Sequence, residues 1–320
     1  IRDSVYANPF LKLPVGRVRY GLMLREDGTA YDDGTCARLS ETHYVMTTTT
    51  ANAGTVFRNL EFARQCLWPD LDVHLISTTD GWAQFSVAGP NSRALLSQVV
   101  DGMDLSNDGF PFMACAECTV FSGTPARLFR ISFSGELAYE ISVPARYGPS
   151  MMDALMTVGE AFDAVPYGTE ALGVMRIEKG HAAGNELNGQ TTAHMLGLGG
   201  MVAQNKDSIG TKLSARPEMI REDNLRLVGF RPVDRTQILT AGAHFLENGA
   251  VADMAHDQGW MTSVAWSPEL GHSVGIGFLK RGAERYGETI RAYSPVRDQD
   301  ILVEVCSAHH IDTGGERQRG

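Results

Sequence analysis

The pattern of this chain changes at about residue 215, and that change limits the folds it can adopt. Before it, short strand-like segments alternate with helical ones; after it, helical periodicity fades and short strands follow one another, separated by Gly and Pro. These strands are expected at 226–230, 242–246, 261–266, 273–279, 289–293 and 301–306. Such spacing is typical of a small β barrel. We therefore predict an α+β protein with a mixed region over residues 1–215 and a barrel over residues 216–320.

The mixed region begins with a predicted hairpin. Residues 19–24 have the composition of a strand, Asp27 and Gly28 form a turn signal, and a second strand is expected over residues 31–38. From Asn52 onward, apolar residues recur at the spacing of a helix with one packed face. The residues in this series are Val56, Leu60, Ala63 and Leu67.

The remaining elements of this region alternate between strands and helices. Further strands are predicted at 43–49, 73–78, 82–87, 126–133 and 138–143, and helices at 91–100, 149–158 and 169–179. Strand alternation places Phe129, Ile131 and Phe133 on one face of the 126–133 strand. In the next strand, alternation turns Glu140 away from its neighbours.

Composition and charge exclude several classes of function. No stretch approaches the about 18 uninterrupted apolar residues that a membrane helix needs, so we expect no membrane span. A net charge of -10 argues against a nucleic-acid partner, because phosphate neutralisation needs clustered Lys and Arg. Five cysteines are an odd number in a large chain and indicate reduced thiols in a cytoplasmic protein.

Most motifs that carry chemistry are absent from the sequence. There is no P-loop, no HExxH and no GxSxG, and two Gly-x-Gly pairs, at 197–199 and 275–277, lack the third glycine of a dinucleotide-binding turn. Cys115 and Cys118 have metal-ligand spacing, but strand alternation would point their sulfurs to opposite faces. His309 and His310 are adjacent and would diverge in the same way. We therefore predict no metal site.

Four segments resemble the aminomethyltransferase family typified by the glycine-cleavage T-protein. A strand leads to a paired Asp-Asp, a second strand turns through a Ser-Gly-Glu, a helix ends in an R-x-E-x-G pattern, and a Lys-Asp segment follows. Their residues are 19–33 (RYGLMLREDGTAYDD), 130–140 (RISFSGELAYE), 176–180 (RIEKG) and 206–210 (KDSIG). They occur in family order and cover residues 17 to 215, so together they are specific although each alone is weak.

Within that family, further segments resemble the alpha subunit of heterotetrameric sarcosine oxidases. These are 46–53 (MTTTTANA), 110–113 (FPFM), 167–170 (YGTE) and 314–317 (GGER). The resemblance implies a T-protein-like fold of intertwined mixed domains plus the barrel, with the N-terminal part of the fold missing before Ile1. It also implies a larger cytoplasmic enzyme of sarcosine catabolism. The FAD, FMN and NAD of that enzyme, its flavin-bearing beta subunit and its small subunits would lie outside this chain.

The resemblance assigns Asp33 as the catalytic residue. It matches the second Asp of the family pair, and a carboxylate near N5 and N10 of folate can move a proton while a carbon–nitrogen bond forms. The alternative is that residues 32–34 are only a turn, since Asp and Gly are favoured there. Tyr20 resembles a tyrosine on the ligand side of the family site, although a core aromatic residue is the competing interpretation.

Three other residues are implied to bind tetrahydrofolate. Glu140 would accept hydrogen bonds from the pterin ring, whereas a lone polar residue on a strand is ordinarily solvent-facing. Phe133 lies where the family often has Tyr, so it keeps the aromatic face and lacks the hydroxyl. Arg176 would lie near the ligand's glutamate tail, and its alternative is an ion pair with Glu178 or Glu170 on the helix surface.

The function implied by the resemblance is one-carbon transfer. The parent oxidase would convert sarcosine to an imine, and this region would capture its carbon on tetrahydrofolate as 5,10-methylenetetrahydrofolate, an activity of one-carbon metabolism. Two alternatives stay open: a stand-alone aminomethyl- or methyl-transferase using tetrahydrofolate, and a non-catalytic folate-binding module.

Overall fold

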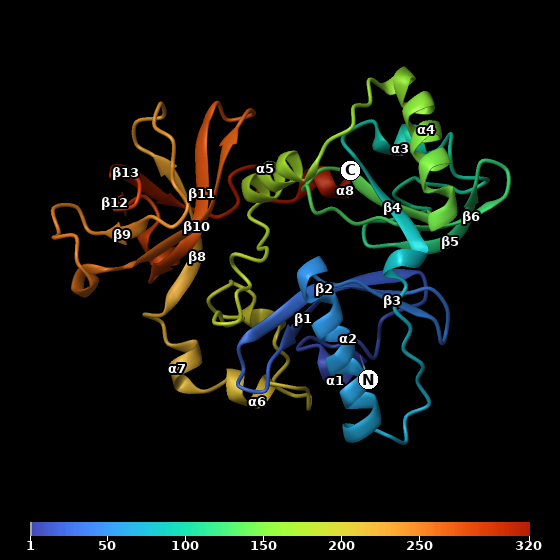
Figure 1. Ribbon diagram of the computed structural model, residues 1–320, viewed down its shortest axis with the longest axis horizontal. Helices are drawn as coiled ribbons and strands as arrows, with labels where there is room; N and C mark the ends of the chain where they lie inside the picture. The colour runs from blue at the N-terminus through green and yellow to red at the C-terminus, as the bar shows by residue number, and fades with distance from the viewer. Residues whose placement is uncertain (1) are drawn as a thin grey trace.

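Figure 1 shows the computed structural model, which describes residues 2–320 as three units, with helix α5 (Thr169–Lys179) between two of them, the barrel and the four-stranded sheet. The units are a small three-stranded sheet, a four-stranded sheet with helices on one face, and a closed barrel. This is the α+β arrangement that the sequence predicts. The N-terminal part of the family's fold is expected to precede Ile1. Ile1 lies outside the described residues, so this expectation stays a prediction.

The three-stranded sheet contains the predicted hairpin. β1 (Arg17–Leu24) and β2 (Ala30–Arg38) pair antiparallel, with Leu22 opposite Asp33. The turn between them needs Gly28, whose φ of 92° is in the left-handed region that favours glycine. β3 (Tyr44–Met46) pairs with the other edge of β2 and is shorter than the predicted strand.

Two helices cover one face of this sheet. α1 (Arg2–Val5) and α2 (Ala53–Phe62) lie beside it, and the side chains of Val56 and Leu60 pack with its core. A π-helical turn (Ala63–Leu67) continues α2, and its first residue is also buried. The helical spacing is thus confirmed as far as Ala63. Leu67 is exposed, because the wider π turn rotates it away from the packed face.

The predicted strand at residues 73–78 is wrong. The segment has no regular secondary structure and is largely exposed, and within residues 2–320 it joins no sheet. Leu75 packs against the core under α2, whereas Ile76 is 79% exposed. Alternating burial therefore exists here without a neighbouring strand to pair the backbone, and pairing is what makes a strand.

The four-stranded sheet supplies the second unit. It has the order β4-β7-β6-β5 with antiparallel neighbours, and helices α3 and α4 pack against one face. Residues such as Leu96, Tyr139 and Ile141 form the core between helices and sheet. The bounds are β4 (Trp82–Ala88), α3 (Ser92–Leu96), β5 (Cys115–Val120), β6 (Thr124–Phe129), β7 (Ala138–Pro144) and α4 (Gly148–Gly159).

Two predictions for this unit need correction. The helix expected over residues 91–100 ends at Leu96, because the backbone of Val100 forms a bridge with Val120 instead. The strand expected over residues 126–133 ends at Phe129. Ile131 is still buried, but Phe133 is 41% exposed and does not share its face, because the chain has left the sheet.

The predicted barrel is confirmed. Six strands close in the order β10-β11-β8-β13-β12-β9 around an apolar core that includes Phe230 and Phe245. The short helices α6 (Thr211–Ser214) and α7 (Pro217–Ile220) precede it, and the division at residue 215 stays a prediction. The strands are β8 (Leu225–Pro232), β9 (His244–Leu246), β10 (Gly259–Ser267), β11 (His272–Lys280), β12 (Thr289–Ser294) and β13 (Gln299–Cys306).

A closing segment runs back across the units. After β13 the chain passes under α5 and ends in α8 (Glu316–Arg319), which Figure 1 places between α5 and the four-stranded sheet. Gly180, which ends α5 with a φ of 78°, leaves no room for a side chain: a Cβ there would lie 2.6 Å from the carbonyl oxygen of Ala308. No helix in residues 2–320 is long and apolar enough to cross a membrane.

Candidate functional site

The inner face of the β1–β2 hairpin connects the three units. Val18, Tyr20 and Leu22 alternate onto this face, and Asp33 lies opposite Leu22. Val18 packs in an apolar cluster with Cys115 and residues 129 and 131 of the four-stranded unit. Leu22 packs in another cluster, which reaches Phe278 of the barrel and residues 187–202. Tyr20 and Asp33 therefore lie between the two contacts through which the hairpin meets the rest of the protein.

Asp33 is held by neutral hydroxyl groups. The Tyr20 hydroxyl donates a hydrogen bond of 2.7 Å to Oδ2 of Asp33, and the Thr49 side chain bonds the same carboxyl. Burial raises the pKa of Asp33, and the charge of Asp32 raises it further, against the two hydroxyl bonds, which lower it. Burial also raises the pKa of Tyr20, which keeps it a proton donor. The arrangement suits a carboxyl that exchanges a proton.

The turn interpretation of residues 32–34 is wrong, because all three lie inside β2. Alternation then gives the two acids different surroundings. Asp32 is fully buried on the outer face, where it accepts hydrogen bonds from the backbone N–H of Thr49 and from Asn52. Asp33 is partly buried on the inner face. The structure thus separates the pair into a structural acid and an accessible one.

Glu140 lies on the face of the four-stranded sheet that α3 and α4 do not cover. It stands opposite Phe129 on β6 and Ser86 on β4, while the adjacent residues Tyr139 and Ile141 are fully buried on the other face. Alternation had predicted this. Phe129 packs in the cluster that joins this sheet to the β1–β2 hairpin. Glu140 is therefore one strand away from that junction.

The carboxyl of Glu140 is partly buried rather than freely solvated. The side-chain amide of Gln84 donates a hydrogen bond to it, and it forms no ion pair within the described part of the chain. Burial raises the pKa of Glu140 to about 7. A carboxyl with a neutral partner and remaining acceptor capacity is suited to receive N–H donors from a ligand.

Phe133 forms a pair with a residue that the sequence did not single out. Its ring stacks on that of His181, with centroids 5.8 Å apart and planes at 27°. Nδ1 of His181 donates to the carbonyl oxygen of Phe133 over 3.0 Å, and burial lowers the pKa of the imidazole. His181 follows the R-x-E-x-G helix end directly, but only the fold shows that this position reaches the Phe133 loop.

Arg176 has a different environment from the one expected. It is 8% exposed, and its guanidinium pairs with Glu186 at 2.9 Å and donates to Ser263 of β10 at 2.8 Å. The surface pairing with Glu178 or Glu170 is therefore wrong, because this end of α5 is buried against the barrel; Glu178 instead accepts from Ser267. A ligand role for Arg176 stays a prediction, and the structure does not place it beside Asp33.

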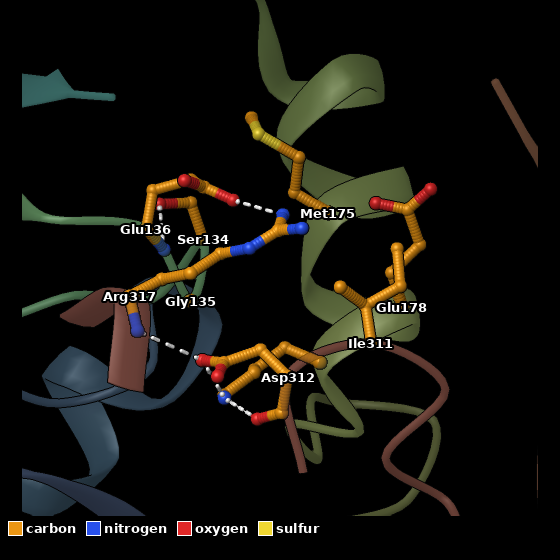
Figure 2. Close-up of a pocket in the computed structure, with 9 residues that line it drawn as sticks. Ser134, Gly135, Glu136, Met175, Glu178, Ile311, Asp312 and Arg317 are labelled. Atoms are coloured by element: carbon orange, nitrogen blue, oxygen red, sulfur yellow. Dashed lines mark hydrogen bonds and ion pairs between the residues drawn. The ribbon is translucent and has the colours of Figure 1, made fainter. Parts of the chain in front are cut away.

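Figure 2 shows a pocket that contains none of the five predicted site residues. It lies between the 134–136 turn, α5 and the closing segment, and the Arg317 side chain extends across it toward Glu136. Arg317 pairs with Glu136 at 2.9 Å and with Glu269 of the barrel end, and Lys179 pairs with Asp312, so four of the five charged side chains that line this pocket are in ion pairs. The fifth, Glu178, accepts a hydrogen bond from Ser267. We place the candidate site at Asp33 and Glu140, which the family motifs indicate and whose carboxyls have no ion pair in residues 2–320.

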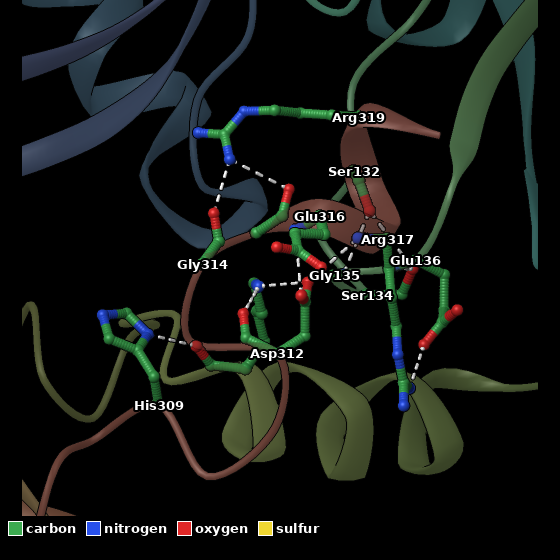
Figure 3. A network of polar contacts seen from close by, with 12 residues as sticks. Ser132, Ser134, Gly135, Glu136, His309, Asp312, Gly314, Glu316, Arg317 and Arg319 are labelled. Carbon is green, nitrogen blue, oxygen red and sulfur yellow. Dashed lines mark hydrogen bonds and ion pairs between the residues drawn. The ribbon is translucent and has the colours of Figure 1, made fainter.

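The same charges belong to a wider network, shown in Figure 3, that we call the clasp (residues 309–320 and their partners). Asp312 accepts hydrogen bonds from Lys179 of α5 at 2.9 Å and from the backbone N–H groups that begin α8. Arg130, which is fully buried beside the four-stranded sheet, donates to the carbonyl oxygen of Arg319. The clasp thus ties the barrel, α5 and the four-stranded sheet together.

Comparison with known families assigns the chain. Residues 1–206 match the GCVT N-terminal domain, and residues 226–312 match the glycine cleavage T-protein C-terminal barrel domain. The chain belongs to the glycine-cleavage T-protein family. An aminomethyltransferase from Streptomyces coelicolor is 30% identical over 86% of the chain and 73% of its own length. The chain also superposes on aminomethyltransferase T from Bartonella henselae with a TM-score of 0.80 and 22% identity, over 97% of this chain and 80% of that one, which shows the fold.

Two further relatives are alpha subunits of sarcosine oxidase, the proteins that segments 46–53, 110–113, 167–170 and 314–317 resemble. Sarcosine oxidase subunit alpha is 47% identical in Rhizobium meliloti, over 98% of this chain and 32% of the relative, and 40% identical in Corynebacterium sp. (strain P-1), over 99% and 33%. The resemblance to these subunits and the prediction of an enzyme are therefore confirmed. The chain spans about a third of their length. All five predicted site residues fall within the family's N-terminal domain, but their roles stay predictions.

Proposed function

We propose that this chain binds tetrahydrofolate between the β1–β2 hairpin and the four-stranded sheet, and transfers to it the one-carbon unit of oxidised sarcosine. The product is 5,10-methylenetetrahydrofolate. The T-protein family assignment supports folate binding, and the similarity to sarcosine oxidase alpha subunits supports the origin of the carbon. The observation that carries the proposal is Asp33, a partly buried carboxyl with a raised pKa, held by neutral hydroxyl groups at the junction of the units.

The chemistry needs one group that both takes and returns a proton. Tetrahydrofolate, when bound, would supply N5 and N10 as the two nucleophiles for the carbon of the protonated imine. Asp33 would accept the N5 proton once the first carbon–nitrogen bond has formed, and would give it to the glycine nitrogen as the bond between that nitrogen and the carbon breaks. Glycine then leaves as a neutral amine, and the N10 proton lost on ring closure goes to water. A raised pKa helps Asp33 in both directions, since it makes the carboxylate a stronger base and keeps the acid form accessible.

Two other residues orient the folate in this proposal. Glu140 accepts hydrogen bonds from the amino group and ring N–H of the pterin, with the capacity left by Gln84. Phe133 is 41% exposed and offers an aromatic ring that already stacks on His181. Water must be kept from the imine, which otherwise hydrolyses to formaldehyde and glycine.

The imine comes from outside this chain in our proposal. The chain corresponds to about a third of the sarcosine oxidase alpha subunits it matches, and we assign the oxidation to the rest of that enzyme. FAD, FMN and NAD, the flavin-bearing beta subunit and the small subunits are proposed for the parent complex alone. Tagged parent protein isolated from its source should then bring down a flavoprotein; recovery as a free methyltransferase would favour a stand-alone enzyme.

Asp33→Asn in the parent oxidase tests the function. The substitution keeps shape and removes proton transfer, so formation of methylenetetrahydrofolate should fall by roughly 10²–10⁴-fold. Amine oxidation should continue, and formaldehyde should rise to match. Asp27→Asn, in the exposed turn of the same hairpin, is the matched control and should change neither product. An unchanged product ratio with folate still bound would show that Asp33 is not catalytic and would favour a folate-binding module.

A further inference from the structure

The segment over residues 47–52 forms a wall against the strand that carries Asp33. The backbone N–H of Thr47 donates to the carbonyl oxygen of Thr35 at 2.8 Å, and the Thr47 hydroxyl accepts from the backbone N–H of Thr35 at 2.8 Å. Gly34 makes this contact possible, because a Cβ at that position would lie 2.1 Å from the carbonyl oxygen of Thr47. The segment therefore touches β2 at the two residues that follow Asp33.

Asp32 anchors the other end of this wall. Its carboxylate is fully buried and accepts from the backbone N–H of Thr49 at 3.2 Å and from Nδ2 of Asn52 at 3.1 Å. No Lys, Arg or His forms an ion pair with it in residues 2–320. A buried carboxylate without a cation depends on its hydrogen-bond donors, and both of these donors come from the wall.

The wall in turn contacts the candidate catalytic group. The side chain of Thr49 hydrogen-bonds Asp33, while its backbone N–H is held by Asp32. One residue thus links the buried acid on the outer face of β2 to the accessible acid on the inner face. The Tyr20 hydroxyl holds Asp33 from the opposite strand.

We propose that Asp32 is a positioning residue that fixes Thr49, and that Thr49 orients Asp33 for the one-carbon transfer. This inference rests on the proposed function of Asp33. It assigns different roles to the two acids of the pair: Asp33 moves the proton, and Asp32 holds the wall that sets the direction and the proton affinity of Asp33.

Asp32 and Thr49 have opposite effects on the pKa of Asp33. After burial, which is the largest cause, the charge of Asp32 raises the pKa of Asp33, whereas the hydroxyl bonds of Tyr20 and Thr49 lower it. The other ionisable groups close to these acids are the phenols of Tyr6 and Tyr31, on which the charge of Asp32 acts, and the thiol of Cys36. Burial raises the pKa of Tyr31. Burial raises the pKa of Tyr6 well above its usual value, so this phenol adds no charge at neutral pH.

The test uses the parent oxidase and three substitutions. Asp32→Asn removes the charge and should lower the pKa of Asp33; Thr49→Val removes the hydroxyl and should raise it. Thr49→Ser keeps the hydroxyl and should restore the wild-type value. The pKa is read by infrared titration of the carboxyl band that disappears in Asp33→Asn. Misplacement of Asp33 should also lower methylenetetrahydrofolate formation by about 10–100-fold in Asp32→Asn and Thr49→Val.

The infrared titration and the product ratio separate two possible failures. If neither Asp32→Asn nor Thr49→Val moves the pKa of Asp33 or the pH profile of product formation, the positioning role is wrong. If both shift the pKa in the expected directions while Asp33→Asn leaves the product ratio unchanged, the wall is as described and the proposed function fails. If the Asp32→Asn variant does not fold, the comparison of Thr49→Val with Thr49→Ser still tests whether the Thr49 hydroxyl sets the pKa of Asp33.

Discussion

Charged groups have different surroundings in the candidate site and at the junction of α5 with the closing segment. At the junction, Arg176 pairs with Glu186 and Lys179 pairs with Asp312, each at 2.9 Å. In the candidate site, Asp33 and Glu140 are bonded to neutral side chains, and neither has an ion pair within residues 2–320. Both regions are partly or fully buried, so burial alone does not distinguish them.

The difference between paired and unpaired acids is visible in their proton affinities. Glu178 of α5 accepts from Ser267 and has no ion pair in residues 2–320, and burial raises its pKa as it does those of the site carboxyls. Burial would raise the pKa of Asp312, but the hydrogen bond and charge of Lys179 and the backbone N–H groups of α8 hold it below its usual value. Burial raises the pKa of Asp33, and it raises that of Glu140 to about 7. A compensated charge fixes the structure, whereas an accessible carboxyl without a counter-charge remains free to exchange protons or to accept a ligand.

The largest effect is expected from breaking the most deeply buried pair. Glu186→Gln leaves the Arg176 guanidinium buried without its counter-charge, and this should lower the free energy of unfolding by about 3–5 kcal/mol in a urea titration. A second substitution, Arg176→Met, should recover most of the loss. Folate affinity, measured by calorimetry with folinic acid on protein that remains folded, should change little. A large loss of affinity with unchanged stability would instead place Arg176 at the ligand.

Removing a partly buried carboxyl that has no counter-charge should raise the free energy of unfolding instead of lowering it. Because folding raises the pKa of Glu140 from 4.5 to about 7, its contribution to stability is present below pH 4.5 and is lost as pH rises toward 7. Glu140→Gln should therefore stabilise the protein by roughly 1–3 kcal/mol at pH 8 and match wild type at pH 4, since partial exposure screens the full value.

The same Glu140→Gln variant should bind folate more weakly. Loss of a charge-assisted hydrogen bond costs about 1.5–3 kcal/mol, or roughly 10- to 150-fold in affinity. Higher stability together with lower affinity is the expected signature of a ligand-binding carboxyl. Unchanged affinity would place Glu140 on a solvated face and remove it from the site.

The smallest effect is expected at the outer part of the clasp. The side chain of Arg317 is 40% exposed, so its pairs with Glu136 and Glu269 are screened by water. Arg317→Gln should lower the free energy of unfolding by only about 0–1 kcal/mol, and the loss should shrink in high salt. A loss that persists at high salt would mean that Arg317 acts as a buried charge. The expected difference between this exposed part of the clasp and the buried pairs of α5 would then be wrong.

The sequence predicted elements whose pattern is local. The hairpin, α5 and all six barrel strands have turn residues and periodicity that need no knowledge of the rest of the chain. The segment at 73–78 has the alternation of a strand but no neighbour, and a missing partner leaves no local trace. The orientation of Phe133 failed for the same reason, because the point where β6 leaves the sheet depends on other segments.

The candidate site shows the same limit. The motifs indicated Asp33 and Glu140, and strand alternation correctly turned Glu140 away from the core under α3 and α4. The partners of Arg176 and the contact between Phe133 and His181 join residues far apart in the chain. Neither contact follows from spacing. Of the site, the sequence therefore predicted which residues to consider, and the fold supplied their neighbours.

The fully buried Arg130 has a consequence for the order of events during synthesis. Its guanidinium donates to the carbonyl oxygen of Arg319, which leaves the ribosome 189 residues later. Until then the surroundings of Arg130 lack one of their acceptors, and an unmet buried donor costs on the order of 1–3 kcal/mol. The four-stranded unit is therefore expected to be loose when it is first made. It becomes rigid only once residues 316–319 of α8 have been made, after the barrel has had time to close.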